Sequence, residues 1–297
     1  MVSRTLNSRN KEIIVTGGIF KTARLLEEWL EDIEDPESLI KDLMRSKPKI
    51  DIFNFWQRVP DTIPKYKYYM EWDNVAALPI KSFDHWWQKQ IDFKVRNKIR
   101  KSQKVGVEVK IVAFDDEFIE CVRKIYDETP IRQGKPFWHY NKGFNYIKNE
   151  LSDNLNRAEF IAAYNENELI GFIKLLYTEQ YALIVLILSM IKHRDKSPTN
   201  SMLSKVVELC DEKKIPYLVY DKYGYGKKGS DTLRDFKRHN GFERVNLPRY
   251  YIPLTLKGKI ILKLNLHRGL IEMFPEKIIG FLLGLRKKWY LRKYSSA

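Results

Sequence analysis

The sequence of 297 residues has two cysteines, Cys121 and Cys210, and lacks any long apolar run. Two cysteines cannot build a disulfide framework or a cysteine metal cluster. We therefore expect no metal site, and we interpret both cysteines as core residues of a reduced protein. The longest apolar stretch, 181–191, is far shorter than the roughly 20 residues of a membrane-spanning helix. No apolar segment follows the N-terminal Met-Val-Ser-Arg, so a cytoplasmic protein without a secretory signal is expected.

Negative charge is also scarce, since 38 Asp and Glu face 53 Lys and Arg, for a net charge of +15. Residues 257–297 hold ten basic and two acidic residues, and so carry +8 of that excess. A second basic cluster without an acid comprises Lys94, Arg96, Lys98, Arg100, Lys101 and Lys104. The positive electrostatic field of such a protein attracts phosphate, nucleic acid, anionic lipid or an acidic protein.

Hydrophobic periodicity predicts alternating strands and helices. In the first part of the chain we expect strands at 12–15, 50–59 and 67–80, and helices at 22–32, 36–45 and 84–104. The last of these helices should bury Trp87, Ile91, Val95 and Ile99. In the second part the pattern predicts strands at 107–112, 160–164, 169–178, 181–191, 217–220 and 243–254, and helices at 115–128, 144–151, 198–214 and 230–239. The apolar stretch 181–191 is typical of a central strand covered on both faces.

Two segments carry a family resemblance. The first is the order of elements, which ends in Phe236-Lys-Arg-His-Asn-Gly-Phe-Glu243 and has a helix starting at Ser197-Pro198 after the most apolar strand. This order resembles the GNAT acyltransferase fold. The second is the basic stretch 96–109, which leads through Gly106-Val107 into a strand. This stretch resembles the Fem-type and BioF2-like branch, which is similar to the peptidoglycan-bridge aminoacyltransferases.

The resemblance implies an α/β (α+β) fold, with a GNAT-type mixed central sheet flanked by helices. The implied domains are an N-terminal partial GNAT-like half over 1–104, a catalytic domain over 105–255 and a basic amphipathic helical tail over 256–297. Two positions depart from the family pattern. The run Arg194-Asp-Lys-Ser-Pro-Thr199 lacks the glycines of the usual donor loop, and Lys237 stands where many members have a tyrosine.

The activity that the resemblance implies is acyl transfer to the amine of a small molecule or peptide. The donor would be a cosubstrate, acyl-CoA or an acyl carrier protein, held between the strands ending near Thr178 and Ile191. Aminoacyl-tRNA is an alternative donor that fits the missing glycines and the positive charge. A non-catalytic module that binds RNA or a membrane is a further alternative.

A donor phosphate site is expected around the start of the 198–214 helix. Backbone N–H groups in a first helical turn lack helical partners and can bind an anion. Those of Thr199, Asn200 and Ser201, with the charges of Arg194 and Lys196, would form the site. The alternative is an ordinary capped helix with solvated basic residues.

Acceptor binding and proton transfer are assigned to residues of three segments. In the polar and aromatic loop 129–140, Arg132 and Gln133 could hold an anion, and Trp138 and Tyr140 could line a pocket. His139 or His193 could act as general base, since histidine titrates near neutral pH. Asp221, at the end of a strand, is a rival base, and Tyr223 begins a possible lid, 223–230, with Lys227 and Lys228. Each of these residues could instead be purely structural.

Apolar and basic residues alternate in the C-terminal tail, around Ile278–Trp289 and Arg286–Lys293. This pattern is typical of an amphipathic helix on an anionic membrane surface, with the protein peripheral to the inner face. The alternative is a helix packed on the domain with a solvated basic face.

Overall fold

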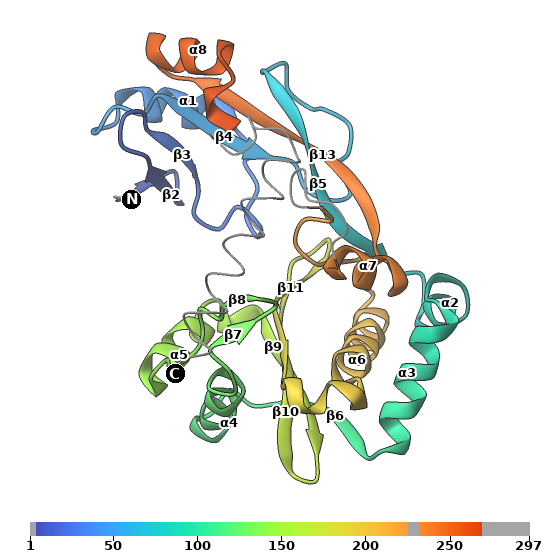
Figure 1. Ribbon diagram of the computed structural model, residues 1–297. Coiled ribbons are helices and arrows are strands. Elements are labelled where there is room, and N and C mark those ends of the chain that lie inside the picture. The colour runs from blue at the N-terminus through green and yellow to red at the C-terminus, as the bar shows by residue number, and fades with distance from the viewer. Residues whose placement is uncertain (1–3, 225–231, 269–297) are drawn as a thin grey trace. The chain divides into compact units, whose positions relative to one another are not determined.

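The computed structural model describes residues 4–224 and 232–268, which form two compact units (Figure 1). The N-terminal unit contains residues up to 75 and those from 245 onward, and the central unit contains residues 76–244. Strands β5 (Met70–Pro79) and β13 (Glu243–Pro253) each continue from one unit into the other. This division differs from the boundaries expected at 104 and 255, because most of β13 pairs within the N-terminal unit. Most of the basic tail, and the expected lid residues Lys227 and Lys228, lie outside the described residues.

The N-terminal unit is built on a mixed sheet in the order β1-β2-β3-β4-β13. Strand β4 pairs in parallel with β3 and antiparallel with β13, with Arg249 opposite Trp56. The apolar face of the sheet packs with Leu39 and Leu43 of the first helix. Its further elements are β1 (Arg4–Ser8), β2 (Lys11–Thr16), β3 (Thr22–Leu25), α1 (Pro36–Arg45), β4 (Ile52–Trp56), α8 (Leu256–Lys263) and the 3-10 turn η4 (Leu266–Arg268).

The sheet of the central unit has the order β5-β12-β11-β10-β9-β6. All neighbours in it are antiparallel except β11 and β12, which are parallel. Its strands are β6 (Val107–Val112), β9 (Ala158–Asn165), β10 (Glu168–Tyr177), β11 (Ala182–Ser189) and β12 (Tyr217–Val219). Its helices are α2 (Phe83–His85), α3 (Phe93–Lys104), α4 (Asp116–Tyr126), α5 (Phe144–Ser152), α6 (Pro198–Glu212) and α7 (Thr232–His239). Short elements are η1 (Trp86–Gln90), the hairpin β7 (Ile131–Arg132) and β8 (Lys135–Pro136), η2 (Leu155–Arg157) and η3 (Ile191–Lys196).

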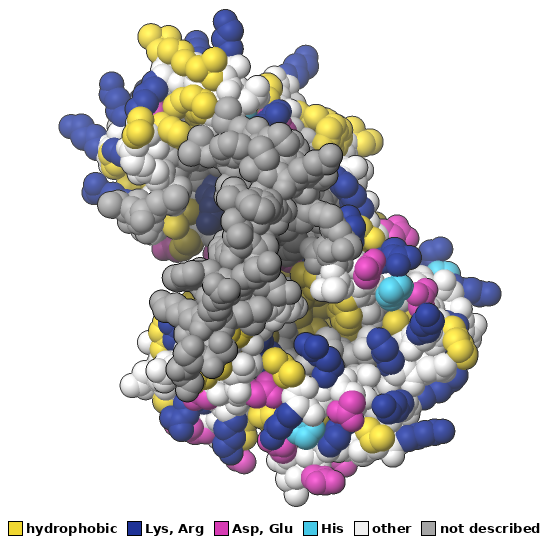
Figure 2. All heavy atoms as spheres, in the orientation of Figure 1, with side chains coloured by type: hydrophobic (Ala, Val, Ile, Leu, Met, Phe, Trp, Pro, Cys, Tyr) yellow, Lys and Arg dark blue, Asp and Glu magenta, His cyan; other side chains and the backbone are white. Residues whose placement is uncertain are grey.

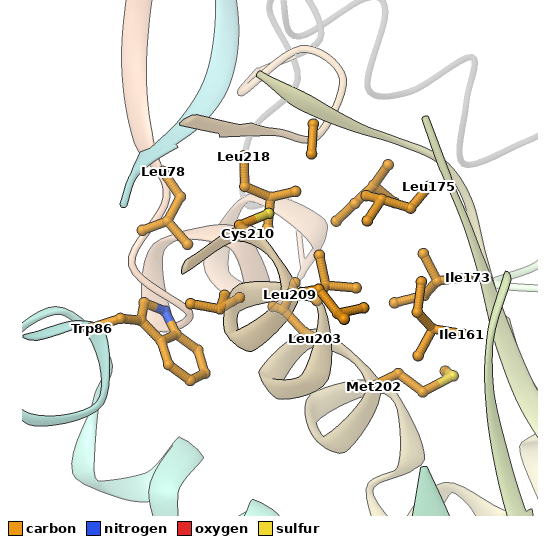
Figure 3. Packing of buried hydrophobic residues seen from close by; sticks show 14 of the residues in the cluster. Leu78, Trp86, Ile161, Ile173, Leu175, Met202, Leu203, Leu209, Cys210 and Leu218 are labelled. Carbon is orange, nitrogen blue, oxygen red and sulfur yellow. The ribbon is translucent and has the colours of Figure 1, made fainter. Parts of the chain in front are cut away.

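Helices cover both faces of the central sheet at β9 and β10. Successive side chains of a strand point to opposite faces, so each strand contributes to two apolar clusters. On β9 and β10, Ile161 and Ile173 join the cluster around α6, as Figure 3 shows. Their neighbours Phe160 and Phe172 join the cluster around α4 and α5 on the other face. The expected mixed sheet flanked by helices is therefore confirmed, and helix α6 packs on the face of the sheet that carries Ile161 and Ile173.

Three sequence expectations are corrected. The segment 22–32, expected to be a helix, is strand β3 followed by turns. The 84–104 helix is interrupted after the π turn η1, in which Ile91 N–H donates to Trp86 O, because Ile91 and Asp92 have extended backbone angles. The extra residue of that turn buries Trp86 in place of Trp87. Strand β11 is buried only in its first half, and its second half is half-exposed.

Candidate functional site

Strands β11 and β12 diverge soon after they meet. Strand β12 pairs only with Ala182 and Leu183, the first two residues of β11. From Ile184 to Ser189 the edge of β11 that faces β12 has no strand beside it in the described part of the chain. By contrast, β11 is paired with β10 along its whole length, from Gly171 opposite Ser189 to Tyr177 opposite Ala182, with one irregularity between Lys174 and Leu175. The donor expected between the strands ending near Thr178 and Ile191 cannot lie there. The opening lies on the other side of β11.

One predicted residue, Asp221, and one buried lysine lie at the C-terminal end of β12. Asp221 has a left-handed φ of 51°, and its carbonyl oxygen accepts a hydrogen bond from Ala76 N–H. The Nζ of Lys237 is 2.6 Å from Lys222 O, to which it donates, and it lies 4.5 Å from the centre of the Tyr220 ring. Lys237 is fully buried, an unusual position for a lysine. This end of β12 therefore holds a buried ammonium group and a carboxylate beside the opening.

The end of β11 is fixed by Arg132 and Glu128. The guanidinium group of Arg132 donates to Ser189 O at 3.0 Å, to Ile125 O and to Glu128 Oε2. Glu128 in turn accepts the backbone N–H groups of Ile191 and Lys192 at 2.7 and 2.9 Å. Burial lowers the pKa of Arg132, which Glu128 partly offsets, and the like charge of Arg194 lowers it further. Arg132 is thus engaged within the protein, and its binding of a substrate anion stays a prediction.

The first turn of α6 offers fewer free N–H groups than expected. Asn200 N–H and Ser201 N–H both donate to Ser197 O, at 3.2 and 3.4 Å. The Asn200 side chain is buried and donates to Asn240 Oδ1, and the Thr199 hydroxyl group lies 3.1 Å from that of Ser189. Ser197 has a left-handed φ of 55° and caps nothing with its side chain. The predicted phosphate site is therefore largely closed.

The two basic residues before α6 differ in their freedom. Lys196 donates to Asn165 Oδ1, and Asn165 donates to the carbonyl groups of Val105 and Gly106. Lys196 thus ties η3 to the end of α3. Arg194 is exposed, and its guanidinium group has no hydrogen bond or ion pair within residues 4–224 and 232–268. Of the two predicted charges, only Arg194 is available to a ligand from the described residues.

His193 lies beside the start of β10, one strand away from the opening. Its Nε2 is 2.9 Å from Glu168 Oε2, and Lys192 Nζ is 2.6 Å from Glu168 Oε1. If Nε2 carries the proton, Nδ1 remains as the proton acceptor. The pKa of Glu168 lies below its usual value, chiefly because of the hydrogen bond from Lys192, with a further contribution from His193 against the opposing effect of burial. His193 therefore has an orienting carboxylate, but not a position beside β12.

The ion pairs of Glu168 with Lys192 and His193 should stabilise the folded protein to an extent that depends on pH. Because the pKa of the Glu168 carboxyl is lower in the folded protein than its ordinary value of 4.5, this contribution is complete above about pH 4.5. It should be lost as the pH falls through the folded pKa. Urea unfolding of the wild type and of Glu168→Gln should show a difference in stability at pH 6 that narrows toward pH 3. A difference that is unchanged or larger at pH 3 would contradict the assignment.

The other predicted residues are scattered. His139 is buried against Tyr126, with ring centres 4.4 Å apart, and its Nδ1 lies 3.5 Å from Glu150. Gln133 is at the tip of the β7–β8 hairpin, and Trp138 and Tyr140 are exposed, with Lys142 over the Trp138 ring. Tyr223 packs against the core cluster around α6. These positions give His139 and Tyr223 packing contacts and place Trp138 and Tyr140 on the surface.

A cavity of about 680 Å³ lies at the opposite edge of the sheet, between β6, α4 and the β9–β10 turn. It contains no residue of the predicted site, and its lining includes Glu108, Asp115, Glu117 and Glu166. Such a negative lining does not suit a phosphorylated donor. Cys210 is buried, and burial raises the pKa of its thiol to about 12, which agrees with a core role.

The exposed face of α3 carries the basic cluster that the sequence shows at residues 94–104. Lys94, Lys98 and Lys104 are exposed, whereas Arg96 donates to the Trp87 and Ile91 carbonyl groups at the π turn. Lys101 donates to Asp195 O in η3, which brings this basic face next to the residues before α6. Lys and Arg side chains are also visible across the molecule in Figure 2. Glu128 was not predicted from the sequence. Its role is to accept the backbone N–H groups of Ile191 and Lys192, which lie more than 60 residues away in the sequence, so no local motif reveals it.

No protein-family model matches the chain, and no curated protein matches its sequence. Solved structures do match. FemX covers 88% of this chain and 90% of its own at 11% identity, with a TM-score of 0.57. The C-terminal domain of a lysylphosphatidylglycerol synthetase from Agrobacterium fabrum covers 89% and 88% at 14% identity, with a TM-score of 0.59. L-PGS from Bacillus licheniformis covers 89% and 88% at 17% identity, with a TM-score of 0.57.

The chain has the GNAT-like fold of the Fem-type proteins. The matches cover nearly nine tenths of each chain and so include both units. The resemblance expected from the sequence is therefore confirmed at the level of the fold. No helix among the described residues is both long and apolar enough to cross a membrane.

Proposed function

We propose that the protein is a GNAT-like transferase that moves an aminoacyl group from the ester of a charged tRNA to an acceptor amine. The observation that carries the proposal is the opening between β11 and β12, which ends at Asp221 and Lys237. The free edge of β11 can align an extended donor by backbone hydrogen bonds. The fold shared with FemX and with lysylphosphatidylglycerol synthetase, whose name refers to a lysyl ester, supports acyl transfer as the reaction class.

The nature of the donor is argued from the closed first turn of α6. With Asn200 and Ser201 N–H groups bonded to Ser197 O, little remains there to hold the pyrophosphate of acyl-CoA. The exposed lysines of α3 and the free Arg194 instead suit the phosphates of an RNA backbone. Acyl-CoA and an acyl carrier protein remain the competing donors.

The chemistry requires a proton acceptor and a balance for negative charge. The amine nitrogen attacks the ester carbonyl carbon, a C–N bond forms, the C–O bond breaks, and the released ribose hydroxyl group takes up a proton. In this proposal Asp221, the carboxylate at the end of β12, accepts the amine proton, and its Oδ1 also accepts the Lys222 N–H. The ammonium group of Lys237, which is buried and donates to Lys222 O, would favour the developing oxyanion through its positive field rather than by direct contact. His193, held by Glu168 beside β10, is the rival acceptor.

A donor test can separate these possibilities. The protein should transfer radiolabelled amino acids from a mixed pool of charged tRNA to the amine of glycinamide or of a lysine-containing peptide. It should not consume acetyl-CoA. Replacing Lys94, Lys98 and Lys104 by Gln should weaken tRNA binding and reduce the slope of log affinity against log salt by about 3. Filter binding measures both effects.

The matched control replaces three exposed lysines of the N-terminal unit, Lys41, Lys47 and Lys49, by Gln. This variant loses the same amount of charge as the α3 variant. Its slope of log tRNA affinity against log salt should stay closer to that of the wild type. Transfer from acyl-CoA or acyl carrier protein alone would contradict the tRNA donor. Tight RNA binding without any transfer would instead favour a non-catalytic module.

A further inference from the structure

Helix α8 is fixed in one orientation on the N-terminal unit. The Thr255 hydroxyl group donates to Asp51 Oδ1 at 2.8 Å and accepts Gly258 N–H at 3.0 Å. Gly258 is buried so tightly that a Cβ atom would lie 2.0 Å from Asp51 O. Ile261, on the same side of the helix, is also buried. The face that carries Gly258 and Ile261 is therefore the inner one, and the opposite face is turned outward.

That outer face is aliphatic. Leu256, Ile260 and Leu264 follow each other at intervals of four and are 78%, 58% and 56% exposed. Residues four apart lie along one side of a helix. Ile19, which is 89% exposed in the loop between β2 and β3, lies beside them, because Lys257 Nζ donates to its carbonyl oxygen. We call these four side chains the α8 ridge, and in Figure 2 apolar side chains are visible over α8.

The exposed charges on α8 itself are all positive, although the buried Asp51 carboxylate lies 4.0 Å from Lys257 Nζ. Lys257, Lys259 and Lys263 are all exposed on the helix. At 100° per residue, Lys257 lies on one side of the apolar line, and Lys259 and Lys263 lie on the other. The sequence has no Asp or Glu from 244 to 271. An aliphatic line bordered by exposed lysines, with no acid on the helix itself, complements a surface that is apolar within and anionic at its boundary.

We infer that the α8 ridge docks the protein onto an anionic membrane surface. Aliphatic side chains that protrude can enter the boundary between headgroups and acyl chains, and the lysines meet the lipid phosphates. RNA is disfavoured as the occupant because the ridge has no aromatic ring on which a base could stack. This inference concerns the N-terminal unit and holds whichever donor the opening at β12 uses.

The test is sedimentation of the full chain with sucrose-loaded vesicles of phosphatidylcholine and phosphatidylglycerol at 3:1, compared with phosphatidylcholine alone. The wild type should bind the anionic vesicles more tightly. The double variant Leu256→Ser/Ile260→Ser should lose about 30-fold in partitioning, taking about fivefold for each half-inserted side chain. Replacing Lys257, Lys259 and Lys263 by Gln should lose about 100-fold, at about fivefold per lysine, and should abolish the preference for phosphatidylglycerol.

The control is Ile63→Ser, which removes an exposed aliphatic side chain elsewhere on the same unit and should bind as the wild type does. All of the changed side chains are exposed, and circular dichroism checks that the variants are folded. Wild-type binding that survives both α8 variants overturns the inference, because the vesicles are then held elsewhere. Absence of vesicle binding by the wild type also overturns the inference. If sedimentation velocity then shows a dimer that the α8 variants do not form, the ridge is instead an interface between two copies of the chain.

Discussion

Replacing Lys237 with methionine should lower turnover by about 10²–10³-fold, with little change in donor affinity. Methionine keeps the length of the side chain and removes only the ammonium group that lies at the end of β12. A charge that is preorganised in a buried position opposite a developing oxyanion is worth about 2.7–4 kcal/mol in the transition state. Single-turnover rates with saturating donor measure this effect directly, because they exclude binding and product release.

The matched control is Lys214→Met, which removes a lysine whose side chain is 82% exposed at the end of α6. It should keep the rate of the wild type. Removing a buried charge can also alter the fold, so thermal unfolding of both variants is needed. A Lys237→Met protein that is folded and turns over at nearly the normal rate would exclude Lys237 from the chemistry.

Replacing Arg249 with methionine should destabilise the N-terminal unit by about 3–5 kcal/mol. Arg249 Nε lies 2.9 Å from Asp73 Oδ2, and its Nη1 lies 3.2 Å from Glu28 Oε2. The guanidinium group also donates to Asn54 Oδ1 and packs over the Trp56 ring. Burial lowers the pKa of Arg249, but Glu28 and Asp73 more than compensate, so the pKa is raised. Methionine would remove the shared positive charge from two nearly buried carboxylates, of which Glu28 would keep its pair with Arg24.

Urea unfolding monitored by tryptophan fluorescence measures the loss. The triple variant Arg249→Met/Glu28→Gln/Asp73→Asn should recover part of it, since the uncompensated charges are then gone. Arg9→Met provides the comparison, because the Arg9–Asp42 pair is exposed and such pairs contribute about 0–1 kcal/mol. An equal loss in Arg9→Met and Arg249→Met would refute the argument from burial.

Much of the fold was predictable because it depends on local periodicity. The helix at 36–45 and the strand at 107–112 have the bounds that their patterns predict. The segment 22–32 failed because its partners are distant. Thr22–Leu25 pairs with β2 and begins the parallel pairing with β4, and Leu26 N–H donates to Glu12 O. These contacts outweigh the helical spacing of Leu25, Leu26, Trp29 and Leu30.

The candidate site was less predictable, because the sequence shows which groups are polar but not what they contact. Arg132 was predicted to bind an anion, and the sequence does not show that Ser189 O, 57 residues away, accepts its hydrogen bond. Lys196 is likewise bound by Asn165, 31 residues away. Asp221 was placed correctly at the end of its strand. Lys237 was noticed only as a departure from the family pattern, since its burial follows from the packing of α7.

The position of β13 has a consequence for synthesis on the ribosome. Strand β4 ends at residue 56, and the strand that covers its open edge begins at residue 243. At about 5–20 residues per second, roughly 10–40 s pass between them. During that time β4 exposes an unpaired apolar edge while the whole central unit emerges and can fold. The part of the chain that is made first is therefore completed last, and nascent chains stalled before residue 243 should depend most on chaperones.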